Sequence, residues 1–142
     1  MGTGQLILVL LAVVLFSTII LTTNTNLFTL AYYSYEAMIS MQGFKIADAF
    51  LQEAEAYNIS ASMTFQDLHN YFTFADSVIN INSINYHVTS SANWCNEFGV
   101  NDMSGSQEYQ RIDITIDCPF GNDTIRVGTN VHPISYIYAS IE

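Results

Sequence analysis

The N-terminal part of the chain is a long apolar run that one short polar stretch interrupts. Residues 6–20 carry almost only aliphatic side chains, the sequence LTTNTN occupies 21–26, and LFTLAYYSY restores the apolar character over 27–35. As an α-helix, residues 6–21 would span about 24 Å, which is less than the hydrocarbon core of a bilayer at about 30 Å. Continued to residue 33, the same helix would span about 42 Å, more than a bilayer needs.

From Glu36 onward the apolar positions follow a helical spacing, with polar residues largely between them. No proline occurs before Pro119, so nothing in this half of the chain forces a helix to break. The pattern predicts a single helix from about Gln5 to Tyr57, apolar all round in its first half and buried on one face in its second. The apolar stripe of the second half consists of Ile39, Gly43, Ile46, Phe50, Ala54 and Tyr57.

The polar stretch is the point where this helix should be weakest. β-Branched threonine loses rotamer freedom in a helix, and asparagine side chains compete for backbone hydrogen bonds. We therefore expect helical hydrogen bonding to be weakened or lost there, with helix on both sides. The residues concerned are Thr22, Thr23, Asn24, Thr25 and Asn26.

Two simpler interpretations fit the apolar run less well. A secretory signal peptide has a basic segment before its apolar core and small residues at its cleavage site. A permanent single-pass anchor usually carries Lys or Arg on its cytoplasmic flank. No charged residue occurs before Glu36, so neither signature is present in this segment.

The pattern changes after Tyr57 from helical spacing to alternation. A helix end is expected over 58–62 and a short turn or helix over 64–72. Alternating apolar residues then predict half-buried strands around 84–88, 112–116 and 125–127, and an apolar strand over 134–141 whose second face must be covered by a loop or another subunit. The expected fold is α+β, with a four-stranded antiparallel sheet packed on the second half of the helix and a long polar loop over 93–107. The predicted segments are 1–35 (apolar helix), 36–57 (amphipathic helix) and 58–142 (β-rich domain).

The charge and the cysteine content of the chain limit the range of possible functions. The chain has 142 residues and a net charge of −10, and it carries only three Lys or Arg residues. Nucleic-acid binding needs clusters of basic residues, so that role is not expected. A single pair of cysteines in an exported protein predicts a disulfide, here Cys95–Cys118, worth roughly 3 kcal/mol. The alternative is two buried thiols.

No arrangement of residues indicates catalysis or a cofactor. The histidines His69, His87 and His132 lie far apart in sequence, and no G-x-S-x-G motif occurs. Carboxylates around the polar loop could hold Ca²⁺ but do not follow the EF-hand spacing; they are Glu97, Asp102, Glu108, Asp113, Asp117 and Asp123. We therefore expect no enzyme activity, metal, cofactor or small-molecule substrate. Asn58 and Asn122 each begin a glycosylation sequon, a match that also arises often by chance.

This combination of a long apolar helix, an amphipathic continuation and a small four-stranded sheet with one disulfide resembles the type IV pilin superfamily. That family normally has a glutamate a few residues into the helix, and Gln5 is the residue nearest that place here. The resemblance implies a homopolymeric extracellular filament on the cell surface, whose subunits lie in the inner membrane before assembly. Two alternatives remain, a minor pseudopilin of a secretion machine and a single-pass membrane protein with an exported binding domain. The expected filament core consists of Leu6, Leu8, Leu10, Leu11, Val14, Leu15, Phe16, Ile19, Ile20, Leu27, Phe28 and Leu30.

Overall fold

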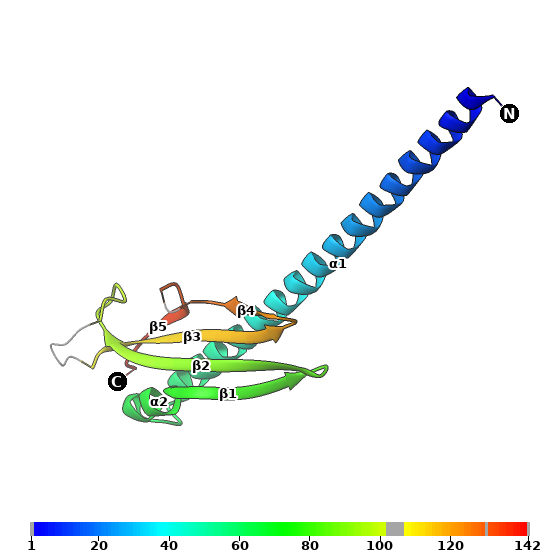
Figure 1. Cartoon of the computed structure of the whole chain (residues 1–142). Coiled ribbons are helices and arrows are strands. Elements are labelled where there is room, and N and C mark those ends of the chain that lie inside the picture. The colour runs from blue at the N-terminus through cyan, green and yellow to red at the C-terminus, as the bar shows by residue number, and fades with distance from the viewer. Residues whose placement is uncertain (1, 102–106, 130, 142) are drawn as a thin grey trace. The chain divides into compact units, whose positions relative to one another are not determined.

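The computed structural model describes residues 2–101, 107–129 and 131–141, and has the α+β fold that the sequence predicts (Figure 1). The chain forms two compact units, Met1–Ala37 and Met38–Glu142, so the amphipathic part of the helix belongs to the same unit as the sheet. The elements are α1 (Thr3–Ser60), α2 (Phe65–Tyr71), β1 (Phe74–Ile81), β2 (Ile84–Cys95), β3 (Tyr109–Phe120), β4 (Asp123–Val127) and β5 (Ile134–Ala139).

Helix α1 is continuous over 58 residues, so the expected interruption at residues 22–26 is wrong. The threonines do not compete with the helix, because their hydroxyls donate to backbone carbonyls one turn earlier. Thr22 bonds to the carbonyl of Thr18 at 2.7 Å, and Thr25 bonds to that of Leu21 at 2.8 Å. In this rotamer the threonine hydroxyl is hydrogen-bonded to the backbone of its own helix. The residues of the expected weak point, Thr22, Thr23, Asn24, Thr25 and Asn26, are all helical.

Strand β3 is the central strand of the sheet. Along one edge it pairs with β2, from Cys95 opposite Tyr109 to His87 opposite Asp117. Its other edge is shared, because residues 116–120 pair with β4 and residues 109–114 pair with β5. All pairs are antiparallel, and β1 adds a fifth strand beyond β2. The expectation of four strands missed β1, whose sequence FADSVINI lacks a regular alternation of apolar and polar residues.

The core of the second unit lies between the C-terminal half of α1 and one face of the sheet. Ile39, Ile46 and Ala54 of the predicted stripe are buried there, with Ala47 and Leu51 added. From the sheet, the three alternating isoleucines of β3 (Ile112, Ile114 and Ile116) are fully buried, as their spacing predicts.

Two tyrosines fasten the sheet to the helix. The hydroxyl of Tyr138, in β5, donates to the backbone carbonyl of Leu51 at 2.7 Å, and that of Tyr86, in β2, donates to the side-chain oxygen of Gln42. Burial raises the pKa of Tyr138 well above its ordinary value, so the hydroxyl stays protonated as this contact requires.

The loop after β2 covers the outer face of the sheet. Gly99 lies so close to Ile137 that an added Cβ would approach the Ile137 Cδ1 atom to 2.8 Å, and its φ of +76° also favours glycine. The side chain of Asn96 holds the loop in shape by accepting from the amides of Phe98 and Val100, each at 3.0 Å. A loop therefore covers Ile137, one of the residues on the second face of β5.

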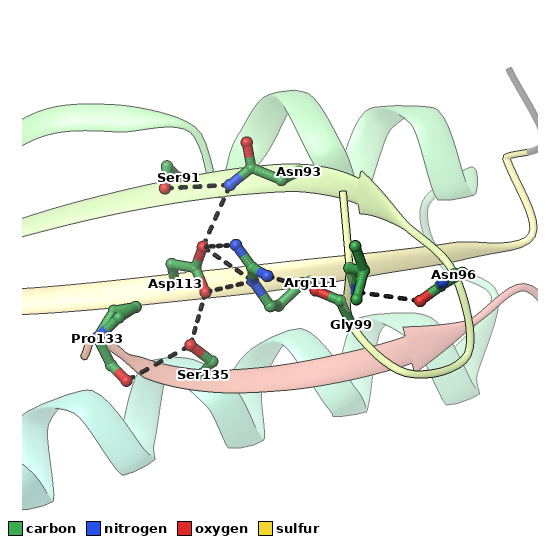
Figure 2. Close-up of polar contacts among 9 residues, drawn as sticks. Ser91, Asn93, Asn96, Gly99, Arg111, Asp113, Pro133 and Ser135 are labelled. Carbon is green, nitrogen blue, oxygen red and sulfur yellow. Dashed lines mark hydrogen bonds and ion pairs between the residues drawn. The ribbon is translucent and has the colours of Figure 1, made fainter. Parts of the chain in front are cut away.

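An ion pair ties the loop to the sheet. Figure 2 shows the guanidinium of Arg111 between the carbonyl oxygen of Gly99 and the carboxylate of Asp113, with an Nε–Oδ1 distance of 2.8 Å for the ion pair. Asp113 also accepts from Asn93 at 3.2 Å and from Ser135 at 2.6 Å. Through this one carboxylate, β2, β3, β5 and the loop are joined.

Helix α2 packs against the C-terminal end of β2. Thr64 caps it by accepting from the amide of Asp67 at 3.1 Å. The ring of His69 stacks on Trp94 with a centroid distance of 4.5 Å and an interplanar angle of 1°. Burial lowers the pKa of His69 below its ordinary value.

Gly43 is expected to be required by packing, because an added Cβ would lie 2.8 Å from the Val127 Cγ2 atom. Alanine is favoured over glycine in a helix by about 1 kcal/mol, but overpacking costs about 1–3 kcal/mol. We expect Gly43→Ala to lower the free energy of unfolding by roughly 1 kcal/mol. In a Val127→Ala background the same change should be neutral or stabilising, as measured by urea unfolding followed through Trp94 fluorescence. Equal effects in both backgrounds would contradict the contact.

Stability should fall as the pH drops below about 6.5, the ordinary pKa of histidine. Because the pKa of His69 is lowered in the folded protein, the unfolded chain binds the proton first and is favoured as the pH falls. Urea unfolding of the wild type and of His69→Gln at pH 8 and pH 5.5 measures this difference. The wild type should lose more stability than the variant, because the variant has no imidazole at position 69. A parallel loss in both proteins would refute the assignment.

Candidate functional site

The outstanding surface of the chain is the apolar segment of α1, residues 3–35. All twelve residues expected to form a filament core are helical and exposed, with exposed fractions from 52% for Ile20 to 78% for Phe28. α1 is the one helix, among the described residues, that is long and apolar enough to cross a membrane. Composition and length by themselves do not separate a membrane span from a helix that packs on other protein.

The apolar surface of this segment surrounds the helix. Residues 6–11 are consecutive large aliphatic side chains, so they cover every direction around the axis. A helix that is apolar all round has no face suited to water and is buried in lipid or protein on all sides. The described contacts within the chain do not bury it, because no residue from 3 to 35 is classed as buried.

The segment is also longer than one bilayer requires. Residues 3–35 extend for about 50 Å as a helix, against a hydrocarbon core of about 30 Å. If residues 6–21 lie in the membrane, the exposed side chains of Leu27, Phe28 and Leu30 lie beyond it. They would need a different apolar environment.

Hydroxyl groups add little to the cost of burying this helix. Every serine and threonine between Leu6 and Leu30 donates its hydroxyl to a backbone carbonyl three or four residues earlier, at 2.7–2.9 Å. A polar group that already has its hydrogen bond can enter an apolar environment at a much lower cost. These residues are Ser17, Thr18, Thr22, Thr23, Thr25 and Thr29.

The expected disulfide between Cys95 and Cys118 is wrong. Cys95 ends β2 and lies opposite Tyr109 at the start of β3, whereas Cys118 lies near the other end of β3. The length of β3 between them is about 30 Å, and a disulfide needs Cα atoms within about 7 Å. Both cysteines are buried free thiols, and burial raises the pKa of each.

The two sequon asparagines lie in different settings. Asn58 is in the last turn of α1, and its side-chain nitrogen donates to the carbonyl of Ala139 at 3.1 Å. Asn122 is exposed in the two-residue turn between β3 and β4, after Gly121 with a φ of +63°. Of the two, Asn122 has the more accessible amide.

Among residues 2–101, 107–129 and 131–141 there is no group of three or more His, Cys, Asp and Glu side chains placed to hold a metal ion. Asp113 and Asp117, considered above for calcium, form ion pairs with Arg111 and Arg126. Asp102 lies outside the described residues. The sequence analysis did not predict the polar cluster of Figure 2. Its members Arg111, Asp113 and Ser135 alternate with the core-facing residues of their strands, which is the signal that could have identified them. The Asp113 carboxylate accepts hydrogen bonds from Arg111 and Ser135, and so it holds the sheet and the loop together.

Comparison with known protein families, with curated proteins and with solved structures finds no match.

The two thiols should be unreactive in the folded protein. Because burial raises their pKa and closes access, few thiolates form near neutral pH. We expect a maleimide reagent to label neither Cys95 nor Cys118 until urea unfolds the sheet unit, and then to label both, as counted by mass spectrometry. A protein that gains no label after unfolding without reductant would instead contain a disulfide.

Proposed function

We propose that this protein is a structural subunit of a helical extracellular filament resembling a type IV pilus. The subunit would polymerise through residues 3–35 of α1, with the sheet unit exposed to solvent. The observation that carries the proposal is that this segment is apolar on all sides and about 50 Å long, so that a single bilayer does not cover it. Packing among copies of the same helix would cover its whole length.

The energetics allow one helix to occupy two environments. In water, each large apolar side chain of the segment would cost about 1.5–3 kcal/mol relative to burial, so the helix does not remain free in solution. Lipid tails are as apolar as leucine, so neighbouring helices can replace lipid with little change in the hydrophobic term. A subunit held in the cytoplasmic membrane can therefore move into a helical core without exposing this surface.

The absence of charge suits both environments. No Asp, Glu, Lys or Arg precedes Glu36, and the net charge of −10 belongs to the rest of the chain. An ionised side chain in lipid or in a packed helical core is costly unless it is paired. The acidic part would favour solubility of the exposed surface.

A single-pass membrane protein with an exported domain is the second candidate, favoured by the membrane-length apolar helix. It explains residues 6–21 but leaves the apolar side chains of residues 27–35 without cover. A minor pseudopilin would use the same helix in a shorter assembly, and filament length and copy number distinguish it from a major subunit.

Leu11→Asp tests the proposal, with Leu11→Ile as the matched control. Leu11 is 59% exposed in the single chain, and an aspartate there would place an unpaired charge in the proposed core. We expect Leu11→Asp to abolish filaments on the cell surface and Leu11→Ile to preserve them, as seen by electron microscopy. Trp94 fluorescence should be the same in both, because the sheet unit has its own core.

Two results would count against the proposal. Filaments of Leu11→Asp with normal length and number would show that this helix is not the assembly core. A wild-type protein recovered solely as a monomer from detergent-solubilised membrane, with no surface filaments, would favour the single-pass candidate.

A further inference from the structure

Asn24 and Asn26 differ from every other polar residue between Leu6 and Leu30. Between Leu6 and Leu30 all six hydroxyl side chains donate to the backbone of their own helix. The two asparagines are the remaining side chains with hydrogen-bonding groups in this range, and neither makes a side-chain hydrogen bond to any described residue. Each amide has two donor hydrogens and an acceptor oxygen that need partners when water is removed.

The position of the asparagines makes them tolerable before assembly. If residues 3–21, about 29 Å of helix, span the hydrocarbon core, Asn24 and Asn26 lie about 4–8 Å beyond Leu21, in the headgroup region where water is present. In a filament core they would be surrounded by apolar side chains such as Leu21 and Leu27. Their amides would then be desolvated, which is strongly unfavourable unless another polar group meets them.

The spacing of the two residues implies two different neighbours. Positions two apart on an α-helix lie about 200° apart around the axis and about 3 Å apart along it. One neighbouring helix cannot contact both amides. Two surfaces on opposite sides are what an open polymer requires, since head-to-tail contacts join unlike faces of successive copies.

We propose that the amide of Asn24 in one copy hydrogen-bonds to the amide of Asn26 in the next and so fixes the register of the packed helices. The inference rests on the proposed filament and names the contact that would specify its helical arrangement. Two amides can bond reciprocally, because each carries a donor and an acceptor. A buried asparagine sets register in coiled coils for the same reason, at some cost in stability.

Single and double leucine variants test the pairing. Asn24→Leu or Asn26→Leu leaves the partner amide buried and unsatisfied, so each should lower filament yield by roughly tenfold, which corresponds to 1.4 kcal/mol. The double variant removes both amides, so its yield should recover to within about threefold of wild type. Its filaments should vary in helical rise and twist, measured by cryo-electron microscopy, because the register contact is gone.

Threonine variants supply the matched control. Thr23→Val and Thr25→Val remove hydroxyls that bond to their own helix, so yield and symmetry should stay within about twofold of wild type. Equal losses in these variants would overturn the assignment to the amides. So would single leucine variants that assemble like the wild type, or a double variant whose loss is the product of the two single losses.

Cysteine cross-linking separates this inference from the filament proposal. Mixed Asn24→Cys and Asn26→Cys proteins, oxidised in membranes or filaments, should form a heterodimer through these positions, while neither variant alone should form a comparable homodimer. Cys95 and Cys118 are buried and should not compete. Cross-linking without filaments would overturn the filament but support the pairing, whereas filaments without this cross-link would overturn the pairing.

Discussion

The structure depends on one constraint, the need of a 33-residue segment of helix, residues 3–35, to avoid water on every side. Its leucine, isoleucine and valine side chains are exposed in the part of the chain that the structure describes. Hydrophobic burial is non-directional, so it decides that the segment is covered but not what covers it. Lipid and copies of the same helix both satisfy the constraint, and the length of the segment is what favours the second.

The sheet unit, Met38–Glu142, meets a different requirement, because it needs a core of its own that does not depend on residues 3–35. It does so by taking the amphipathic half of α1 as one wall of its own core, where Ile39, Ile46 and Ala54 belong to the same buried cluster as the isoleucines of β3. Gly43 lets β4 approach the helix closely, and the Tyr138 hydroxyl joins β5 to the helix backbone. A core of this kind can remain intact while residues 3–35 change their surroundings.

Sequence periodicity correctly predicted those helices and strands that bury one face against the core. The alternation at Ile112, Ile114 and Ile116 and the stripe through Ile39 and Ile46 were predicted because one face of each element is buried. Strand β1 was missed because an edge strand with irregular burial has no such period. The prediction of a disulfide was wrong because alternation along the strand places Cys118 toward the core but does not give its distance from Cys95 along the sheet.

In the apolar segment, helix propensity did not predict the observed structure. Five poor helix formers at 22–26 predicted a weak point, yet helix α1 continues through them, and the threonine hydroxyls bond to carbonyls of the same helix. Hydroxyls can be satisfied locally in this way, whereas the longer-reaching amides of Asn24 and Asn26 make no such bond. Between Leu6 and Leu30 no residue is charged and every hydroxyl bonds to its own helix, so those two amides are the polar groups left to supply the directional contact that leucine and valine lack. Apolar contact can hold such helices together, and a directional contact between amides adds a preference for one register over others of similar energy.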